Sequence, residues 1–270
     1  MSSRSLSAMF LLFATLVSTD RISADRAPLR VCADPADLPF SDVRGNGFEN
    51  RLARIVATFL DREVEFVWQR MGRGFVREYM DSGKCDVVMG IPTAFRSLLT
   101  TQPYYRSSYV FLTRRSASFQ PASLDDARLK QFRIGVEALQ DEYTPPAEAL
   151  SRRGLQSQLV GIYSVGSHSM DVARALSRRE VDLAIMWGPI AGYAAIQAPK
   201  SFVLKPVQPE SDGSLQFTFA ISMGVRKGDL ALQSQLNVFI NAHRVDIAKL
   251  LDRYGVPELN LNEASIPVKQ

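Results

Sequence analysis

Side chains able to carry out acid–base or nucleophilic chemistry are few in this chain. The two histidines, His168 and His243, are far apart in sequence, and a histidine needs a positioned partner to act as a general acid or base. No Gly-x-Ser-x-Gly elbow, Walker loop, Cys-x-x-Cys or His-Glu-x-x-His motif occurs. Both Gly-x-Gly sequences lack the third glycine of a dinucleotide fingerprint. We therefore expect a protein that is not an enzyme.

Carboxylates are the other group that could do chemistry. Asp34, Glu49, Asp141 and Glu142 could supply oxygen ligands to a metal ion if the fold brought them into one cleft. The sequence contains no EF-hand loop, and scattered carboxylates are usually solvated. We therefore predict neither a metal site nor a resident cofactor.

The two cysteines, Cys32 and Cys85, form a candidate disulfide, because a cysteine pair in an oxidising compartment usually becomes bonded. Cys32 lies late in one predicted strand and Cys85 just before another. If these strands were parallel neighbours in plain register, the two Cα atoms could be too far apart to bridge. We expect the bond, and two free thiols remain the alternative.

The N-terminus has the layout of a secretory signal peptide. Arg4 gives it a positive start, residues 8–17 form a short apolar run, and Ile22-Ser23-Ala24 offers a cleavage site. The apolar run is too short to span a bilayer as a helix. We predict that residues 1–24 are removed and that the mature chain is periplasmic; an uncleaved N-terminal helix is the alternative.

Composition excludes some classes of partner. The formal net charge is +4, from 32 Lys and Arg against 28 Asp and Glu, and no dense basic stripe is present, which argues against nucleic-acid binding. The local basic cluster Arg70, Arg73 and Arg77 fits a solvated helix face or an anion contact. No second apolar stretch is long enough to anchor the mature chain in a membrane.

Two series of alternating strands and helices must position these residues. In the first, strands are predicted at 29–33, 64–68 and 86–90 and helices at 48–60 and 75–80. In the second, strands are predicted at 132–136, 158–162 and 181–186, with helices beginning at Thr144 as N-cap, near Val172 and at Pro189. Such alternation predicts parallel sheets with right-handed crossovers.

Segments 109–113 and 216–222 are predicted to be strands that connect the two units, and two helices follow the second one. If the chain crosses twice, these C-terminal helices complete the first unit. The predicted fold class is therefore α/β, with two lobes that each have a parallel-core sheet flanked by helices, joined by two hinge strands. We place residues 25–112 and 218–270 in lobe 1 and residues 113–217 in lobe 2.

Ligand sites in open α/β sheets lie beyond the carboxyl ends of strands. Eight residues next to predicted strand ends are therefore candidates for a cleft between the lobes: Asp34, Phe40, Pro92, Thr93, Arg96, Gln140, Asp141 and Trp187. Trp187 could equally be a core aromatic, and Tyr104 and Tyr105 are expected to pack at the hinge. An aromatic cleft with few fixed charges would suit an apolar or peptide-like segment better than a small zwitterion.

Several segments resemble the family 3 solute-binding proteins of periplasmic transport systems, over Leu29 to Gly255. They are residues 29–35, 38–40, 47–49, 83–90 and 103–107. Others are similar to a subgroup, the J-type accessory proteins associated with PQQ-dependent methanol dehydrogenases and related quinoproteins. They are residues 74–77, 99–107, 144–147, 187–193 and 254–257.

The resemblance implies a two-lobed, hinged periplasmic binding-protein fold of type II, with altered ligand recognition. Trp187 occupies the place of the family's aspartate that pairs with a ligand ammonium. Arg96 matches the carboxylate-binding arginine only with a shifted gap, and residues 139–142 replace the family's Gly-Thr/Ser-Thr loop with acidic groups. These departures argue against an α-amino-acid ligand.

We therefore expect a non-enzymatic periplasmic accessory protein that assists maturation or activation of a PQQ-dependent methanol or alcohol dehydrogenase. It would contact a peptide segment or surface of that enzyme and hold no PQQ of its own. The alternative is the substrate-binding component of an ABC importer for a small solute other than a standard α-amino acid. That role would add a permease as partner.

Overall fold

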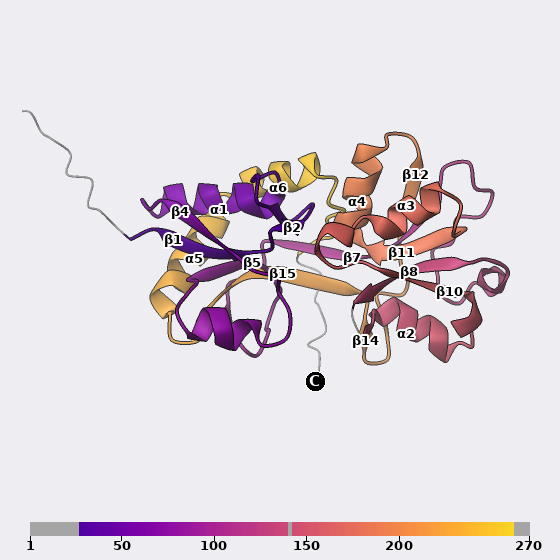
Figure 1. Cartoon of the computed structure of the whole chain (residues 1–270), viewed down its shortest axis with the longest axis horizontal. Helices are drawn as coiled ribbons and strands as arrows, with labels where there is room; N and C mark the ends of the chain where they lie inside the picture. The colour runs from indigo at the N-terminus through magenta and orange to yellow at the C-terminus, as the bar shows by residue number, and fades with distance from the viewer. Residues whose placement is uncertain (1–26, 140–141, 262–270) are drawn as a thin grey trace, which may run out of the picture.

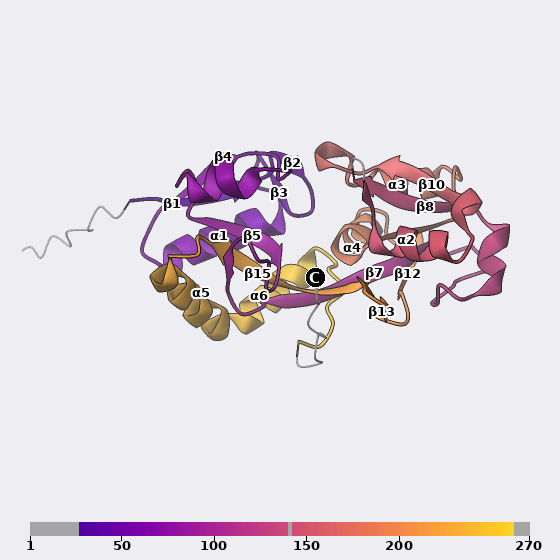
Figure 2. The same ribbon diagram turned by 90° about the horizontal axis from the view of Figure 1, so that it is seen from below.

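The computed structural model of the chain describes residues 27–139 and 142–261. The predicted signal peptide, 1–24, lies outside these residues. Eight strands lie edge to edge in the order β10-β8-β11-β7-β15-β5-β1-β4, and helices cover both ends of this row (Figure 1). The two ends form two lobes, and β7 and β15 run between them (Figure 2). The two-lobed α/β fold is thus the one that the sequence predicted.

Lobe 1 is built on β1 (Leu29–Ala33), which pairs in parallel with β4 (Val64–Trp68) on one side and β5 (Val87–Pro92) on the other. Its helices and short strands are β2 (Ala36–Asp37), β3 (Ser41–Asp42), α1 (Phe48–Phe59), η1 (Val76–Asp81), β6 (Leu99–Thr100), α5 (Leu230–Ala242) and α6 (Arg244–Arg253). The short helix predicted near Tyr79 is a single π-helical segment, η1.

The C-terminal helices complete lobe 1, as the sequence predicted. Leu52 and Val56 of α1 share a buried core with Leu236 of α5 and Leu251 of α6. Figure 1 shows α5 and α6, in orange to yellow, in the same lobe as the indigo β1 and α1. Not every apolar side chain of α1 is buried, since Ile55 is 37% and Phe59 39% exposed.

Lobe 2 is built on β8 (Ile134–Leu139), which pairs in parallel with β10 (Leu159–Tyr163) and β11 (Leu183–Trp187). Its other elements are η2 (Ala127–Gln131), β9 (Glu142–Tyr143), α2 (Pro145–Arg152), η3 (Gln156–Gln158), η4 (Gly166–His168), α3 (Asp171–Ser177), α4 (Gly188–Gln197), β12 (Phe202–Pro206), β13 (Ser211–Asp212) and β14 (Leu215–Gln216). Thr144 takes the N-cap position of α2, but its side chain makes no capping hydrogen bond.

The two lobes share the long strands β7 (Tyr105–Arg114) and β15 (Thr218–Val225). Residues 105–108 of β7 pair antiparallel with β15, whereas residues 109–114 pair antiparallel with β11 and β12. β15 continues into lobe 1 by pairing with β5. Both predicted connecting strands are therefore present. The exact lobe boundaries, at 112/113 and 217/218, stay a prediction.

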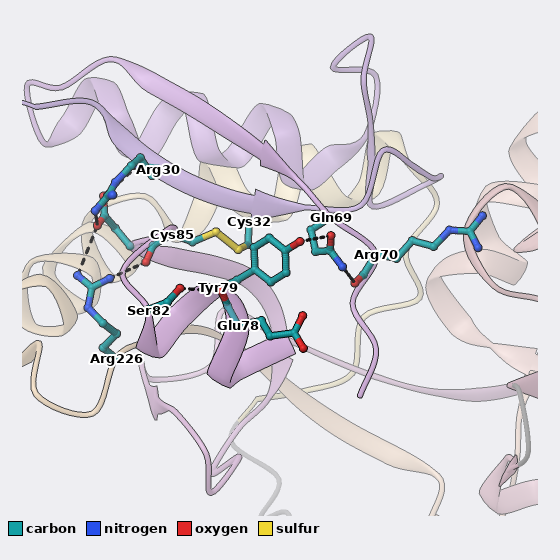
Figure 3. Close-up of a disulfide and its surroundings, with 10 residues drawn as sticks. Arg30, Cys32, Gln69, Arg70, Glu78, Tyr79, Ser82, Cys85 and Arg226 are labelled. Carbon is teal, nitrogen blue, oxygen red and sulfur yellow. Dashed lines mark hydrogen bonds and ion pairs between the residues drawn. A yellow bond between two sulfur atoms is a disulfide. The ribbon is translucent and has the colours of Figure 1, made fainter. Parts of the chain in front are cut away.

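A disulfide joins Cys32 of β1 to Cys85, which lies just before β5 (Figure 3). The two Cα atoms are 5.5 Å apart, within the range that a disulfide spans. The strands are parallel neighbours, but Cys32 lies opposite Val88, and the turn before β5 brings Cys85 back beside it. The expected geometric obstacle is therefore absent.

Beside this disulfide, a buried acid is surrounded by arginines. Asp86 forms ion pairs with Arg30 at 2.7 Å, Arg62 at 3.3 Å and Arg226 at 3.4 Å, and its side chain is 8% exposed. Arg226 also donates a hydrogen bond to the Cys85 carbonyl at 2.5 Å. Burial alone would raise the pKa of Asp86, but the Arg30 hydrogen bonds and the Arg30 and Arg62 charges lower it overall. We call Asp86 and its three arginines the Asp86 cluster.

Within the described residues, no helix combines the length and the apolar character needed to cross a membrane.

Candidate functional site

A cavity of about 390 Å³ lies between the lobes, where β2, β5 and α1 face β8 and β11. We call it the cleft cavity. Its walls come from both lobes and from the two shared strands. The lining residues are Asp37, Phe40, Ser41, Glu49, Met71, Gly90, Pro92, Tyr105, Tyr109, Glu137, Leu139, Ser164, Trp187, Ile190, Phe219 and Ile221. This volume lies in the range of small-molecule sites.

Three of the predicted cleft residues, Phe40, Pro92 and Trp187, line this cavity. Asp34 does not line it; its carboxylate accepts the Ala36 N–H at 2.9 Å and so shapes the turn into β2.

The other predicted cleft residues lie elsewhere. Thr93 donates its hydroxyl to the Ala220 carbonyl at 3.0 Å, on the β15 side, and does not line the cavity. Arg96 is exposed and is also absent from the lining. Gln140 and Asp141 lie outside the described residues.

Trp187 is both a packing residue and a cleft wall. Its ring packs edge-on against Tyr109 and Phe219, with ring centroids 5.5 and 5.8 Å apart. Its backbone N–H donates to Glu137 Oε2 at 2.9 Å. This backbone hydrogen bond holds the Glu137 carboxylate beside Trp187 at the cavity wall.

Three carboxyl groups face the cleft cavity: Asp37 from β2, Glu49 from α1 and Glu137 from β8. The sequence analysis expected few fixed charges in the cleft and did not foresee this group of three carboxyl side chains. Sequence reasoning had considered Glu49 only as a scattered metal ligand and had missed Asp37 and Glu137. A usable signal was present for Glu137, since it interrupts the otherwise apolar strand 134–139.

Burial and mutual repulsion favour the protonated forms of these acids. Desolvation, with the nearby charge of Asp34, raises the pKa of Asp37 to about 7. Desolvation, with the charge of Asp37, raises the pKa of Glu49 to about 8. For Glu137, desolvation and Asp37 outweigh the Trp187 N–H and raise the pKa to about 7. Asp37 is thus coupled to one acid in each lobe.

Glu49 is the most isolated of these acids. It is 5% exposed, and no hydrogen-bond donor among the described residues reaches its carboxylate. Gly90 makes room for it, because a Cβ there would lie 2.0 Å from Glu49 Oε1. The side chain therefore sits buried at the cavity wall without a partner.

Charged groups elsewhere are paired or exposed. Arg106 is buried, and its guanidinium forms an ion pair with Glu210 at 2.5 Å. His168 and His243 each pair with the aspartate three residues later, at 2.7 and 3.2 Å, on the surface. No three His, Cys, Asp or Glu side chains within the described ranges converge closely enough to hold a metal ion.

The basic cluster predicted from the sequence is divided between two places. Arg73 and Arg77 line a surface hollow of about 790 Å³ next to η1, together with Lys227. Arg70 points away from the disulfide toward lobe 2 (Figure 3), where a Cβ at Gly166 would lie 3.7 Å from its guanidinium. Arg70 does not line the cleft cavity.

Residues 29–257 match the model of the bacterial extracellular solute-binding proteins, family 3. The protein MoxJ of Methylorubrum extorquens is 30% identical over 267 residues, which cover 91% of this chain and 86% of MoxJ. MoxJ of Paracoccus denitrificans is 26% identical, over 91% of this chain and 94% of its own length.

Two solved structures extend this similarity to the fold. MxaJ from Methlophaga aminisulfidivorans MPT has a TM-score of 0.73 and 26% identity, over 86% of this chain and 100% of MxaJ. The periplasmic binding protein XoxJ from Methylobacterium extorquens AM1 has a TM-score of 0.71 and 34% identity, over 86% of this chain and 99% of XoxJ.

Proposed function

Because the chain belongs to the bacterial extracellular solute-binding proteins of family 3, we propose that it acts by binding and not by catalysis. Its specific role would be that of a periplasmic accessory protein that assists maturation or activation of a PQQ-dependent methanol or alcohol dehydrogenase. The observation that carries this proposal is the nearly full-length similarity to MoxJ, MxaJ and XoxJ, whose subgroup the sequence motifs resemble.

The lining of the cleft cavity argues against a free amino acid as the ligand. No Lys, Arg or His side chain is among the described residues that line it, so the carboxylate of a free amino acid would have no cationic partner there. A buried carboxylate without such a partner is costly. This supports a ligand, or a partner segment, that is not an α-amino acid.

The proposed role requires the chain to be exported to the periplasm. Residues 1–24 would direct the chain across the inner membrane, and the mature protein would meet the dehydrogenase in the periplasm. The disulfide between Cys32 and Cys85 suits that oxidising compartment.

The direct test is co-purification of the C-terminally tagged chain with the quinoprotein dehydrogenase of its own host. A tagged amino-acid receptor of the same fold, expressed in the same strain, is the matched control for non-specific capture. We expect the dehydrogenase with the first protein and not with the second. A deletion strain should lose methanol- or alcohol-dependent dye reduction and regain it on complementation. No association, together with unchanged activity in the deletion strain, would overturn the role.

A second candidate function is supported by the cleft cavity itself. A cavity of about 390 Å³ can hold a small solute, as the receptor of an ABC importer would require. A receptor predicts a ligand-dependent rise in melting temperature and uptake of that solute, lost on deletion of the gene. An intact uptake profile in the deletion strain would exclude this role.

A further inference from the structure

We propose that the cleft cavity binds an organic cation, a compact ammonium or guanidinium group without a neighbouring carboxylate, held by Asp37, Glu49 and Glu137. The inference goes beyond the proposed function and does not rest on it. The cation could come from a free amine or from a basic side chain of a partner protein, and the test below separates the two.

The first support is the one-sided charge of the cavity. Its described lining contains three carboxyl groups and no basic side chain. The Asp86 cluster shows how this chain buries another acid, with arginines around it. The cleft acids lack such partners, so a cation from outside would supply the missing charge.

The second support comes from polar side chains that line the cavity and have no hydrogen-bond partner within the described protein. The carboxylate of Glu49 has no donor among the described residues. Tyr105 and Tyr109 are 1% and 8% exposed and line the cavity, and neither hydroxyl has a hydrogen-bond partner within the described part of the chain. A ligand with hydrogen-bond donors would supply the partners that the protein does not offer to these groups.

The third support is the aromatic wall. Trp187, Tyr109 and Phe219 form a packed edge-to-face series, and Phe40 and Tyr105 line the same cavity. Aromatic faces attract ammonium and guanidinium groups, most strongly in desolvated sites. An aromatic wall in a cavity that also contains carboxyl groups fits an organic cation better than an apolar or anionic ligand.

The geometry also selects the size of the cation. Within the described chain, no three acidic, His or Cys side chains converge as a metal ion requires. Asp37 and Glu49 belong to lobe 1 and Glu137 to lobe 2, so the charge must be met from two sides. A cation whose charge or donors extend over several atoms can do this, and it would draw the lobes together.

Protons compete with such a cation for the three carboxyl groups. The titratable neighbours are Asp34 beside Asp37, Tyr104 and Tyr105 beside Glu49, Tyr109 beside Glu137, and Glu258 beside Tyr105. The pKa values of the tyrosines are raised by burial, so they stay neutral below pH 10, and none of these neighbours is a cation. Affinity should therefore rise as the pH rises through the range in which Asp37, Glu49 and Glu137 ionise.

The test is calorimetric titration and thermal unfolding of the full mature protein at low ionic strength. The free-amine probes are putrescine, agmatine and tetramethylammonium, the side-chain probe is Nα-acetyl-arginine amide, and succinate is the anionic control. We expect at least one cation to raise the melting temperature at about 10 mM and succinate to leave it unchanged. Binding by the free amines indicates a small-molecule ligand, whereas binding by the capped arginine alone indicates a partner's side chain.

Variants locate the site. E49Q and E137Q should each lower the affinity for the tightest-binding probe by about tenfold or more, because each removes one ionised partner at nearly constant side-chain shape. E65Q, on the exposed face of β4, is the matched control and should bind as the wild type does. If no cation binds, or if E49Q and E137Q bind as tightly as E65Q, the proposal is overturned.

The pH series provides a readout that does not depend on any variant folding. Tetramethylammonium carries its charge at every pH, so a change in its affinity comes from the protein. Its binding should strengthen by about tenfold between pH ~6 and pH ~8.5 as the carboxyl groups ionise. A flat pH series would overturn the proposal.

Discussion

Lobe 1 contains two kinds of buried acid, and their surroundings differ sharply. Asp86 lies beside the disulfide and forms ion pairs with three arginines. Glu49 lies at the cleft cavity, where no cationic side chain of the described chain lines the walls. The surroundings of Asp86 lower its pKa overall, whereas burial and the charge of Asp37 raise the pKa of Glu49 to about 8.

The difference separates a structural acid from one that is left open to a ligand. The charge of Asp86 is neutralised by the chain itself, so its ionisation stabilises the fold. The charge of Glu49 is opposed by the fold, so its ionisation destabilises the empty protein. Substituting the two acids should therefore change stability in opposite directions.

Removing the disulfide beside the Asp86 cluster should have the largest effect. The bond closes a sequence separation of 53 residues, and C32A/C85A should lower the free energy of unfolding by about 4 kcal/mol through the greater entropy of the unfolded chain. Urea unfolding of the variant and the wild type measures this loss. Equal midpoints would mean that the bond contributes nothing to the stability of lobe 1.

D86N should have the second largest effect. It should lower the free energy of unfolding by about 3 kcal/mol, because three arginines lose their common partner. The arginines are partly exposed, which keeps the loss below that of a fully buried pair. Asp86 stabilises the fold above its ordinary pKa, and this contribution disappears as the pH falls through its lowered value. Urea unfolding at about pH 7 and in mild acid should show the D86N deficit shrinking in acid; a constant deficit would contradict the ion-pair explanation.

E49Q should change folding stability in the opposite direction to D86N. Because its pKa is raised, protonated Glu49 contributes to folding stability below about pH 4.5, and this contribution is lost as the pH rises through about 8. At about pH 8.5 the variant should be more stable than the wild type by about 2 kcal/mol, because the buried charge is gone while a buried amide remains. The advantage should vanish near pH ~5 in thermal unfolding. If E49Q were less stable than the wild type at high pH, ionised Glu49 would not destabilise the fold, and the two acids would not differ in this respect.

E148Q should have the smallest effect and provides the solvent-exposed reference. Glu148 pairs with Arg152 at 2.5 Å on the surface of α2, and both side chains are largely exposed. Exposed pairs one helical turn apart contribute about 0.3–0.5 kcal/mol, so the midpoint of urea unfolding should barely move. A loss comparable to that of D86N would show that burial is not what distinguishes the Asp86 cluster.

The sequence predicted the elements of the fold well where periodicity was strong. The strands at Leu29–Ala33 and Val64–Trp68 and the two C-terminal helices lie where alternation and helical spacing placed them. β12, Phe202–Pro206, was missed, because it is a short strand at the end of lobe 2 that pairs only with β7. Short strands such as β2 and β3 form through tertiary contacts and leave little local signal.

The candidate site was predicted less well, because it depends on distances between lobes. Phe40, Pro92 and Trp187 were found from strand ends, which is a topological rule. Asp37 and Glu137 were missed although they also follow predicted strands, Asp37 between Asp34 and Phe40 after strand 29–33 and Glu137 directly after strand 132–136. Their meeting depends on how β2 of lobe 1 faces β8 of lobe 2.

By itself the sequence determined the class of the fold, the pairing of Cys32 with Cys85 as an expectation, and the family to which the chain belongs. These depend on periodicity, composition and motif order, which are properties of the chain read locally. Only the tertiary structure decided that Asp37, Glu49 and Glu137 share one cavity while Asp86 is enclosed by arginines. Burial and electrostatic coupling depend on which groups become neighbours in space, and identical carboxylates therefore acquire opposite roles.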